Sequence, residues 1–69
     1  MIFKFRKNKL INITDVDSLE VGDTLVKKEN NNEYKIIRIK DNLIHYENDN
    51  EFGFCNKVCV NSNYKKRKN

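Results

Sequence analysis

The hydrophobic positions of this chain fall into short runs of β-branched and aromatic residues, and asparagines and aspartates separate the runs. Runs of this kind between turn-forming residues are typical of β-strands. The pattern predicts strands at residues 24–29, 33–40, 43–47, 51–55 and 58–60, preceded by an N-terminal pair at 2–6 and 10–14 that joins around Lys7 and Asn8. No run is long and apolar enough to span a membrane, so we expect no membrane partner.

The predicted hairpins place side chains of the same kind on the same face of the sheet. Turns at residues 30–32, 41–42 and 48–50 set the pairing, and a slip of one residue would turn every side chain to the other face. The inner face is then apolar, with Leu25, Ile37, Ile39, Ile44, Tyr46, Phe52 and Phe54. The outer face carries a mixed set: Val26, Lys28, Tyr34, Ile36, Arg38, Lys40, Leu43, His45, Glu47, Gly53 and Cys55.

Helical character is confined to residues 14–22. Thr14 or Asp15 suits an N-cap, Gly22 supplies a positive φ at the stop, and Asp23 caps the turn that follows. We therefore predict an all-β fold: a small barrel of five to six strands built on a β-meander, with at most one short helical or 3₁₀ turn.

The segment that opens the meander carries a recognisable motif. Its residues, Leu19-Glu20-Val21-Gly22-Asp23-Thr24-Leu25-Val26, resemble the opening of SH3-like barrels, including KOW-type and elongation-factor-P-type domains. The resemblance implies an SH3-like barrel over residues 19–60, a fold that hosts nucleic-acid binders, peptide binders and interaction modules alike. KOW-type domains carry a glycine in the next loop, where this chain has three asparagines, which argues against a ribosome-type RNA function.

Length and charge add a division of the chain. Sixty-nine residues suit one small domain, which we assign to residues 1–63, followed by a basic tail at 64–69. The tail is either an arm that contacts phosphates or a solvated terminus that aids solubility. The net charge of +4 comes from that tail, because the first 63 residues hold ten basic and ten acidic side chains. The abundance of asparagine, lysine and isoleucine, without alanine or proline, indicates an AT-rich genome, as in a low-GC bacterium, its phages or plasmids, or a large virus.

Few residues suit catalysis or metal binding. His45 is the sole histidine, which excludes a two-histidine metal site, and the predicted register places Cys55 diagonally across from it without a third catalytic group. On a straight strand Cys55 and Cys59 would lie about 13 Å apart, too far for a disulfide. We expect no enzymatic activity, no metal and no cofactor.

Two binding functions of different classes fit the pattern. In the first, nucleic acid or a nucleic-acid-bound protein contacts Lys28, Tyr34, Arg38, Lys40, Lys65, Lys66, Arg67 and Lys68. In the second, a phage- or mobile-element-type inhibitor, for example an anti-defence protein, binds a host protein through Val26, Ile36, Leu43 and His45. The N-terminal segment or a second copy of the chain are alternative covers for that apolar face. Without an export signal, we expect a cytoplasmic protein.

Overall fold

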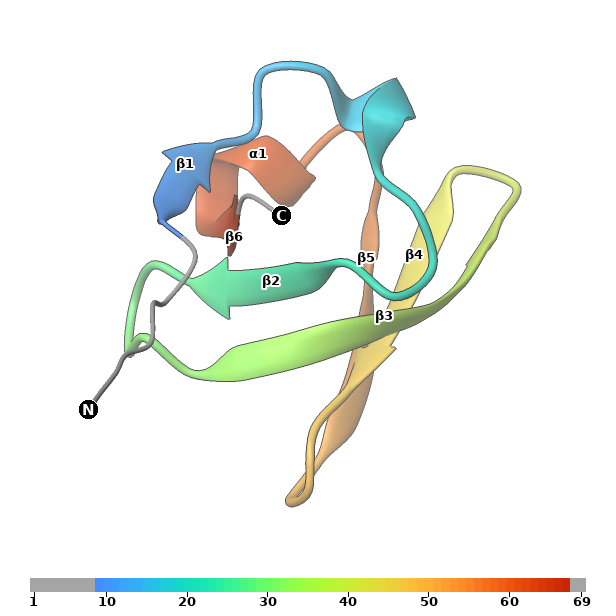
Figure 1. The fold of residues 1–69 in the computed structure, drawn as a ribbon. Helices are drawn as coiled ribbons and strands as arrows, with labels where there is room; N and C mark the ends of the chain where they lie inside the picture. Colours follow the sequence, from blue (N-terminus) through green and yellow to red (C-terminus); the bar gives the residue numbers. More distant parts are fainter. Residues whose placement is uncertain (1–8, 68–69) are drawn as a thin grey trace, which may run out of the picture.

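The computed structural model describes residues 9–67 and is all-β, as predicted (Figure 1). Six strands and two short helical segments follow one another along the chain. They are β1 (Leu10–Asn12), η1 (Val16–Ser18, a 3₁₀ turn), β2 (Thr24–Lys27), β3 (Glu33–Lys40), β4 (Leu43–Glu47), β5 (Phe52–Asn56), α1 (Val60–Asn63) and β6 (Tyr64–Arg67). The 3₁₀ turn was predicted, whereas the one-turn helix α1 was not.

All six strands belong to one antiparallel sheet in the order β1-β6-β2-β3-β4-β5. The meander from β2 to β5 forms one side of it, and β6 returns from the end of the chain to lie between β1 and β2. The sheet twists strongly, and η1 and α1 lie on the same side of it (Figure 1). Within residues 9–67, β1 and β5 each pair on one side only, so they are the two edge strands.

The hydrophobic core lies on the inner face of this curled sheet. Leu25, Ile36, Ile44 and Val60 are fully buried. Ile13 and Leu19, from the connections around η1, pack into the same cluster and cover the end of the sheet. Burying a side chain of this size contributes about 1.5–3 kcal/mol, which is a large contribution in so small a domain.

Three tyrosines complete the core. The Tyr34 ring packs edge-on against Tyr46 at 4.8 Å between centroids, and Tyr64 packs against Tyr46 at 5.5 Å. The buried Tyr46 and Tyr64 hydroxyls form a hydrogen bond of 2.6 Å, and the Tyr34 hydroxyl donates to Glu51 Oε2 at 2.8 Å. Each phenol therefore buries its ring while its hydroxyl keeps a partner, as a buried tyrosine requires.

The turn residues behave as the sequence predicts. Asp15 is the N-cap of η1 and accepts from the Asp17 amide, and Asp23 Oδ2 accepts from the Glu20 amide at 2.9 Å. Gly22 has a φ of +100°, where a side chain would be strained. Asp41 and Asn42, with φ of 52° and 69°, form the two-residue turn between β3 and β4.

The predicted register holds for one hairpin and is wrong for two. Arg38 pairs with His45 and Ile39 with Ile44, as predicted, but a bulge between Ile36 and Arg38 shifts the rest of β3. The β4–β5 pairing is displaced by one residue, since Tyr46 faces Gly53 rather than Phe52. The β2–β3 pairing is displaced by three residues, since Leu25 faces Tyr34 rather than Ile37. These displacements exchange the faces of several side chains.

Two further predictions need correction. Residues 58–60 form a turn and the start of α1 rather than a strand. The segment predicted as a tail from residue 64 begins as β6, which pairs with both β1 and β2, so a domain boundary at 63 would cut the sheet. The N-terminal strand predicted at 2–6 lies outside the described residues, and β1 pairs with β6.

Candidate functional site

The outer face of the sheet, opposite the core, carries basic and aromatic side chains that are exposed to solvent. Register partners in antiparallel strands share a face, so the pairing defines three rows across β3, β4 and β5. The rows are Lys35–Glu47–Phe52, Arg38–His45–Phe54 and Lys40–Leu43–Asn56. On β6, Lys65 and Arg67 face the same side, because Lys65 pairs with Val26 and Val26 with Glu33. We call this surface the outer face.

Positive charge concentrates on the outer face. Residues 9–67 contain ten basic and ten acidic side chains and are formally neutral. Five of the basic residues lie on the outer face of the strands: Lys35, Arg38, Lys40, Lys65 and Arg67. Only two of the acidic residues, Glu33 and Glu47, lie there with them. The fold therefore separates charges that the sequence mixes: the outer face of the strands is mainly basic, and most acidic residues lie in the connections between the strands.

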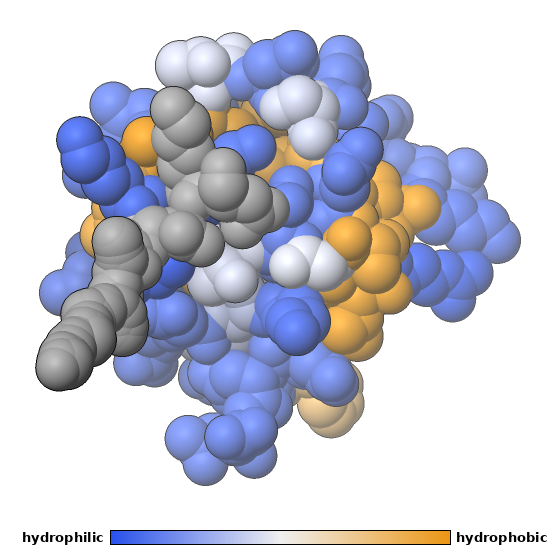
Figure 2. All heavy atoms as spheres, viewed as in Figure 1, coloured by the Kyte–Doolittle hydropathy of each residue, from blue (hydrophilic) through white to orange (hydrophobic). Residues whose placement is uncertain are grey.

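Two phenylalanines stand on this face without cover. Phe52 is 85% exposed and Phe54 is 66% exposed, both on the edge strand β5. The Phe54 ring lies 5.9 Å from the His45 ring, centroid to centroid, and Ile37 on the bulge of β3 is also exposed. Figure 2 shows hydrophobic side chains gathered on the side of the molecule where β3 and β4 lie, next to hydrophilic ones. Burying both rings would have stabilised the fold by several kcal/mol, so their exposure points to an interaction.

The sequence assigned both phenylalanines to the core, and the β4–β5 loop explains the difference. Asn48 accepts hydrogen bonds from the amides of Asn50 and Glu51 through its side chain, and its own amide donates to the Glu51 carbonyl. The loop therefore spans four residues instead of three. Gly53 gives a second signal, because a Cβ there would lie 3.1 Å from the Tyr46 ring. With Gly53 under Tyr46 on the inner face, both phenylalanines must point outward.

The predicted nucleic-acid contacts divide into several groups. Four of them lie on the outer face: Arg38, Lys40, Lys65 and Arg67. Arg67 forms an ion pair of 2.6 Å with Glu33, and this interaction raises the pKa of Arg67. Lys66 pairs with Leu25 and so faces the inner side. Lys28 donates to the Asn61 carbonyl. Lys68 lies outside the described residues.

Tyr34 requires a correction. Its side chain is only 4% exposed, so its ring offers no face to a base. Its hydroxyl is bound to Glu51, and this hydrogen bond raises the pKa of Tyr34. The aromatic part of the interface consists of Phe52 and Phe54 instead.

The apolar partner surface also changes. Ile36 is fully buried in the core, and Val26, although on the outer side, is only 3% exposed. Neither side chain is available to a partner. The observed register turns Ile36 to the inner face, and the Val26 side chain is covered by its neighbours. Leu43 and His45 do lie on the outer face and are half-buried.

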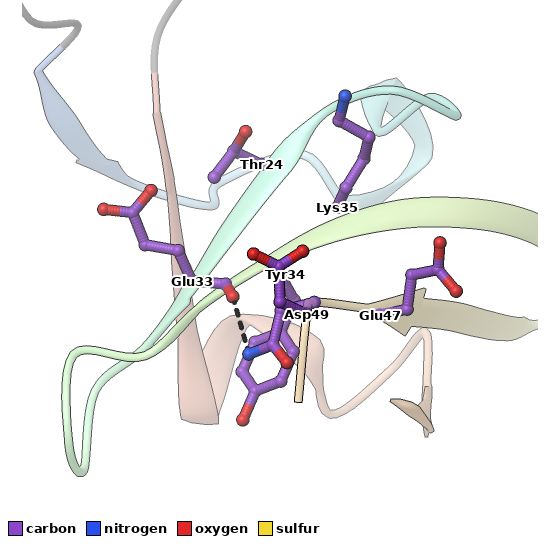
Figure 3. Close-up of a pocket in the computed structure, with 7 residues that line it drawn as sticks. Thr24, Glu33, Tyr34, Lys35, Glu47 and Asp49 are labelled. Carbon is purple, nitrogen blue, oxygen red and sulfur yellow. Dashed lines mark hydrogen bonds between the residues drawn. The ribbon is translucent and has the colours of Figure 1, made fainter. Parts of the chain in front are cut away.

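Among the cavities that open on the surface of residues 9–67 are a pair of about 220 Å³ each. One is lined by Val26 and Lys65 together with Leu10, Lys28 and Asn31. The other lies between the ends of β3 and β4, where Thr24, Lys35 and Glu47 project to the same side while the Tyr34 ring points away from them (Figure 3). This cavity between β3 and β4 adjoins the Lys35–Glu47–Phe52 row of the outer face.

The cysteine and histidine do not meet. Cys55 pairs with Ile44 and packs against the core, whereas His45 is on the outer face. Burial, with a smaller contribution from Cys59, raises the pKa of the Cys55 thiol to about 11, which keeps it protonated at neutral pH. Both cysteines are free. Among residues 9–67, no three His, Cys, Asp or Glu side chains gather as metal ligands, and no helix is long and apolar enough to cross a membrane.

Comparison of the chain with known protein families, with curated proteins and with solved structures finds no match.

Proposed function

We propose that this protein is a non-enzymatic binding module for nucleic acid and that the outer face is its interface. The observation that carries the proposal is the coincidence, on one face of one sheet, of five basic side chains with two exposed phenylalanines. A basic surface alone attracts many polyanions. Exposed aromatic rings beside it add a way to hold bases.

The basic residues supply the affinity in this proposal. Arginine and lysine side chains bind phosphates and release the counterions condensed on them, which favours association most strongly at low salt. Arg38 and Lys40, two residues apart on β3, extend outward from a rigid strand and not from a loop. The resemblance to SH3-like barrels, which include nucleic-acid binders, agrees with this function by analogy only.

The test measures binding as a function of salt concentration. Fluorescence anisotropy of a labelled oligonucleotide of mixed sequence is titrated with the protein between about 50 and 200 mM salt. We expect log K to fall linearly with log salt. The double variant Arg38→Gln/Lys40→Gln should bind more weakly at low salt, with a slope reduced by about 0.7 for each lost contact to a single strand.

The matched control removes two charges elsewhere. Lys9 is exposed before β1, and Lys27 pairs with Tyr64 on the inner side of the sheet, so Lys9→Gln/Lys27→Gln has the same net charge as the test variant. Equal losses in the two variants would indicate attraction by net charge without a defined interface. Absence of binding to any oligonucleotide at the lowest salt would refute the proposed function.

A protein-binding inhibitor is the second candidate, and one observation favours it. The edge strand β5, Phe-Gly-Phe-Cys-Asn, has no charged residue, and natural edge strands usually carry charges that prevent pairing with another strand. A target protein could add a strand there and contact Phe54. In that case Phe54→Asp would abolish inhibition of the target, while Arg38→Gln/Lys40→Gln would leave it nearly unchanged.

A further inference from the structure

The outer face has a geometry that selects among nucleic acids, and this step rests on the proposed function. Phe52 and Phe54 are two residues apart on β5, and their side chains point to the same side. Successive residues of a strand advance by about 3.4 Å, so the two rings are separated by about 6.8 Å along the sheet. The two phenylalanine side chains thus leave the strand far enough apart for each ring to hold its own base.

That separation is about twice the rise of 3.4 Å between neighbouring nucleotides in one strand of a duplex. Two consecutive bases can each lie on a ring only if the nucleic acid is extended and its bases are unstacked from one another. A paired duplex holds its bases stacked and turned inward, whereas a single strand can present them to aromatic side chains.

The charges beside the rings define where the phosphates lie. Across the sheet from Phe54 the row continues through His45 to Arg38, and Lys40 lies two residues further along β3. In the Phe52 row Glu47 separates the ring from Lys35, and its carboxylate repels phosphate. The backbone of a bound strand is thereby directed along β3, from Lys35 past Arg38 to Lys40, while its bases reach over β4 to the rings on β5.

The length of the track limits the footprint. Lys35 pairs with Glu47 and Lys40 with Leu43, which are four residues apart on β4, because the bulge adds a residue to β3 without lengthening the pairing. The track is therefore about 14 Å long, which corresponds to about two extended nucleotides. Asp41 and Asp49 stand in the turns at the two ends of β4 and disfavour phosphates beyond them. We infer that the outer face binds a short segment of extended single-stranded nucleic acid, with two consecutive bases stacked on Phe52 and Phe54 and the backbone along β3.

The test compares structures of nucleic acid and removes the rings one at a time. Labelled single-stranded DNA and RNA of mixed sequence, and the same DNA annealed to its complement, are titrated against the protein at low salt. We expect the single strands to bind more tightly than the duplex. Phe52→Ala and Phe54→Ala should each weaken single-strand binding by about 5- to 150-fold, the range found for loss of one stacked base.

Two comparisons separate stacking from other effects. Phe54→Tyr keeps the ring and should bind as the wild type does, whereas Val58→Ala removes an equally exposed apolar side chain, 74% exposed, outside the outer face and should have no effect. Loss of a phenylalanine should leave the salt slope unchanged, because no phosphate contact is removed. Since both rings are exposed, thermal unfolding should show that the variants remain folded.

The outcomes distinguish this inference from the function on which it rests. If the duplex binds as tightly as the single strand and both phenylalanine variants bind normally, while Arg38→Gln/Lys40→Gln still weakens binding, stacking is refuted and the nucleic-acid function stands. If no probe binds at low salt, both are refuted.

Discussion

At the scale of single residues, two neighbouring isoleucines on β3 lie in different environments, one in the core and one on the surface. Ile36 is fully buried among core residues, whereas Ile37 is 43% exposed at the bulge. Ile36→Ala should therefore lower the free energy of unfolding by about 2–5 kcal/mol, and Ile37→Ala by about 1 kcal/mol or less. Urea denaturation of the two variants measures both values. The reverse order would show that the sheet has the register expected from the sequence and not the one described here.

The tyrosine cluster makes stability sensitive to alkaline pH. Burial, and then the hydrogen bond with Tyr46, raise the pKa of Tyr64 far above its ordinary value of 10.0. Below about pH 10 the phenol is protonated in both the folded and the unfolded state, and its contribution to stability is fully present. Above that pH it ionises in the unfolded state first, so stability falls as pH rises towards the folded-state pKa.

The Tyr64→Phe variant tests this dependence, because phenylalanine cannot ionise. Its free energy of unfolding should be lower at neutral pH, by about 0.5–1.5 kcal/mol for the lost hydrogen bond, but should decline less steeply above pH 10 than that of the wild type. Part of the decline persists, since the hydrogen bond to Glu51 also raises the pKa of Tyr34. Parallel declines in the two proteins would show that Tyr64 titrates normally in the folded state.

At the scale of elements, the β4–β5 hairpin depends on one asparagine. The Asn48 side chain accepts from two amides of the loop and donates to the Glu33 carbonyl at 3.0 Å, which ties the loop to the start of β3. Asn48→Ala should destabilise the protein by about 1–3 kcal/mol through these lost hydrogen bonds, while Asp49→Ala, in the same loop, should cost less than about 0.5 kcal/mol. Chemical denaturation compares the two, and equal effects would argue that the loop does not depend on Asn48.

The elements also show what a sequence pattern can and cannot predict. The bounds of β3 and β4 agree with the prediction, because Asp41 and Asn42 form a local turn whose conformation those residues favour. The predicted length of β2 is wrong. The pattern suggested a strand to residue 29, but Lys27 closes the β2–β3 loop by backbone hydrogen bonds with Asn31 and Asn32. The outer face was predicted in part. Arg38, Lys40, Leu43 and His45 lie on it as predicted, but the position of the phenylalanines depends on a loop length that the pattern does not determine.

At the scale of the whole molecule, folding separates basic from acidic side chains that are mixed along the sequence. Residues 9–67 are formally neutral, yet the outer face is basic and the connections, such as those with Asp15, Asp17, Glu20 and Asp23, are acidic. This arrangement depends on β6, which carries Lys65 and Arg67 into the middle of the sheet from the far end of the sequence. The pairing of Leu10 with Arg67 joins residues that no local pattern relates, which explains why the segment resembled a solvated tail.

The position of β6 leads to the last prediction. Deleting residues 64–69 removes the strand between β1 and β2, and with it the buried Tyr64 ring and the hydroxyl that bonds Tyr46. A domain of this size has only about 5–15 kcal/mol of stability, so we expect the truncated chain to be unfolded, with loss of the far-ultraviolet circular dichroism of the sheet and of amide dispersion in NMR spectra. Deleting only residues 68–69 should preserve both signals, because β6 ends at Arg67. A truncated chain without residues 64–69 that kept native amide dispersion would show that this segment is the dispensable basic tail its composition suggests.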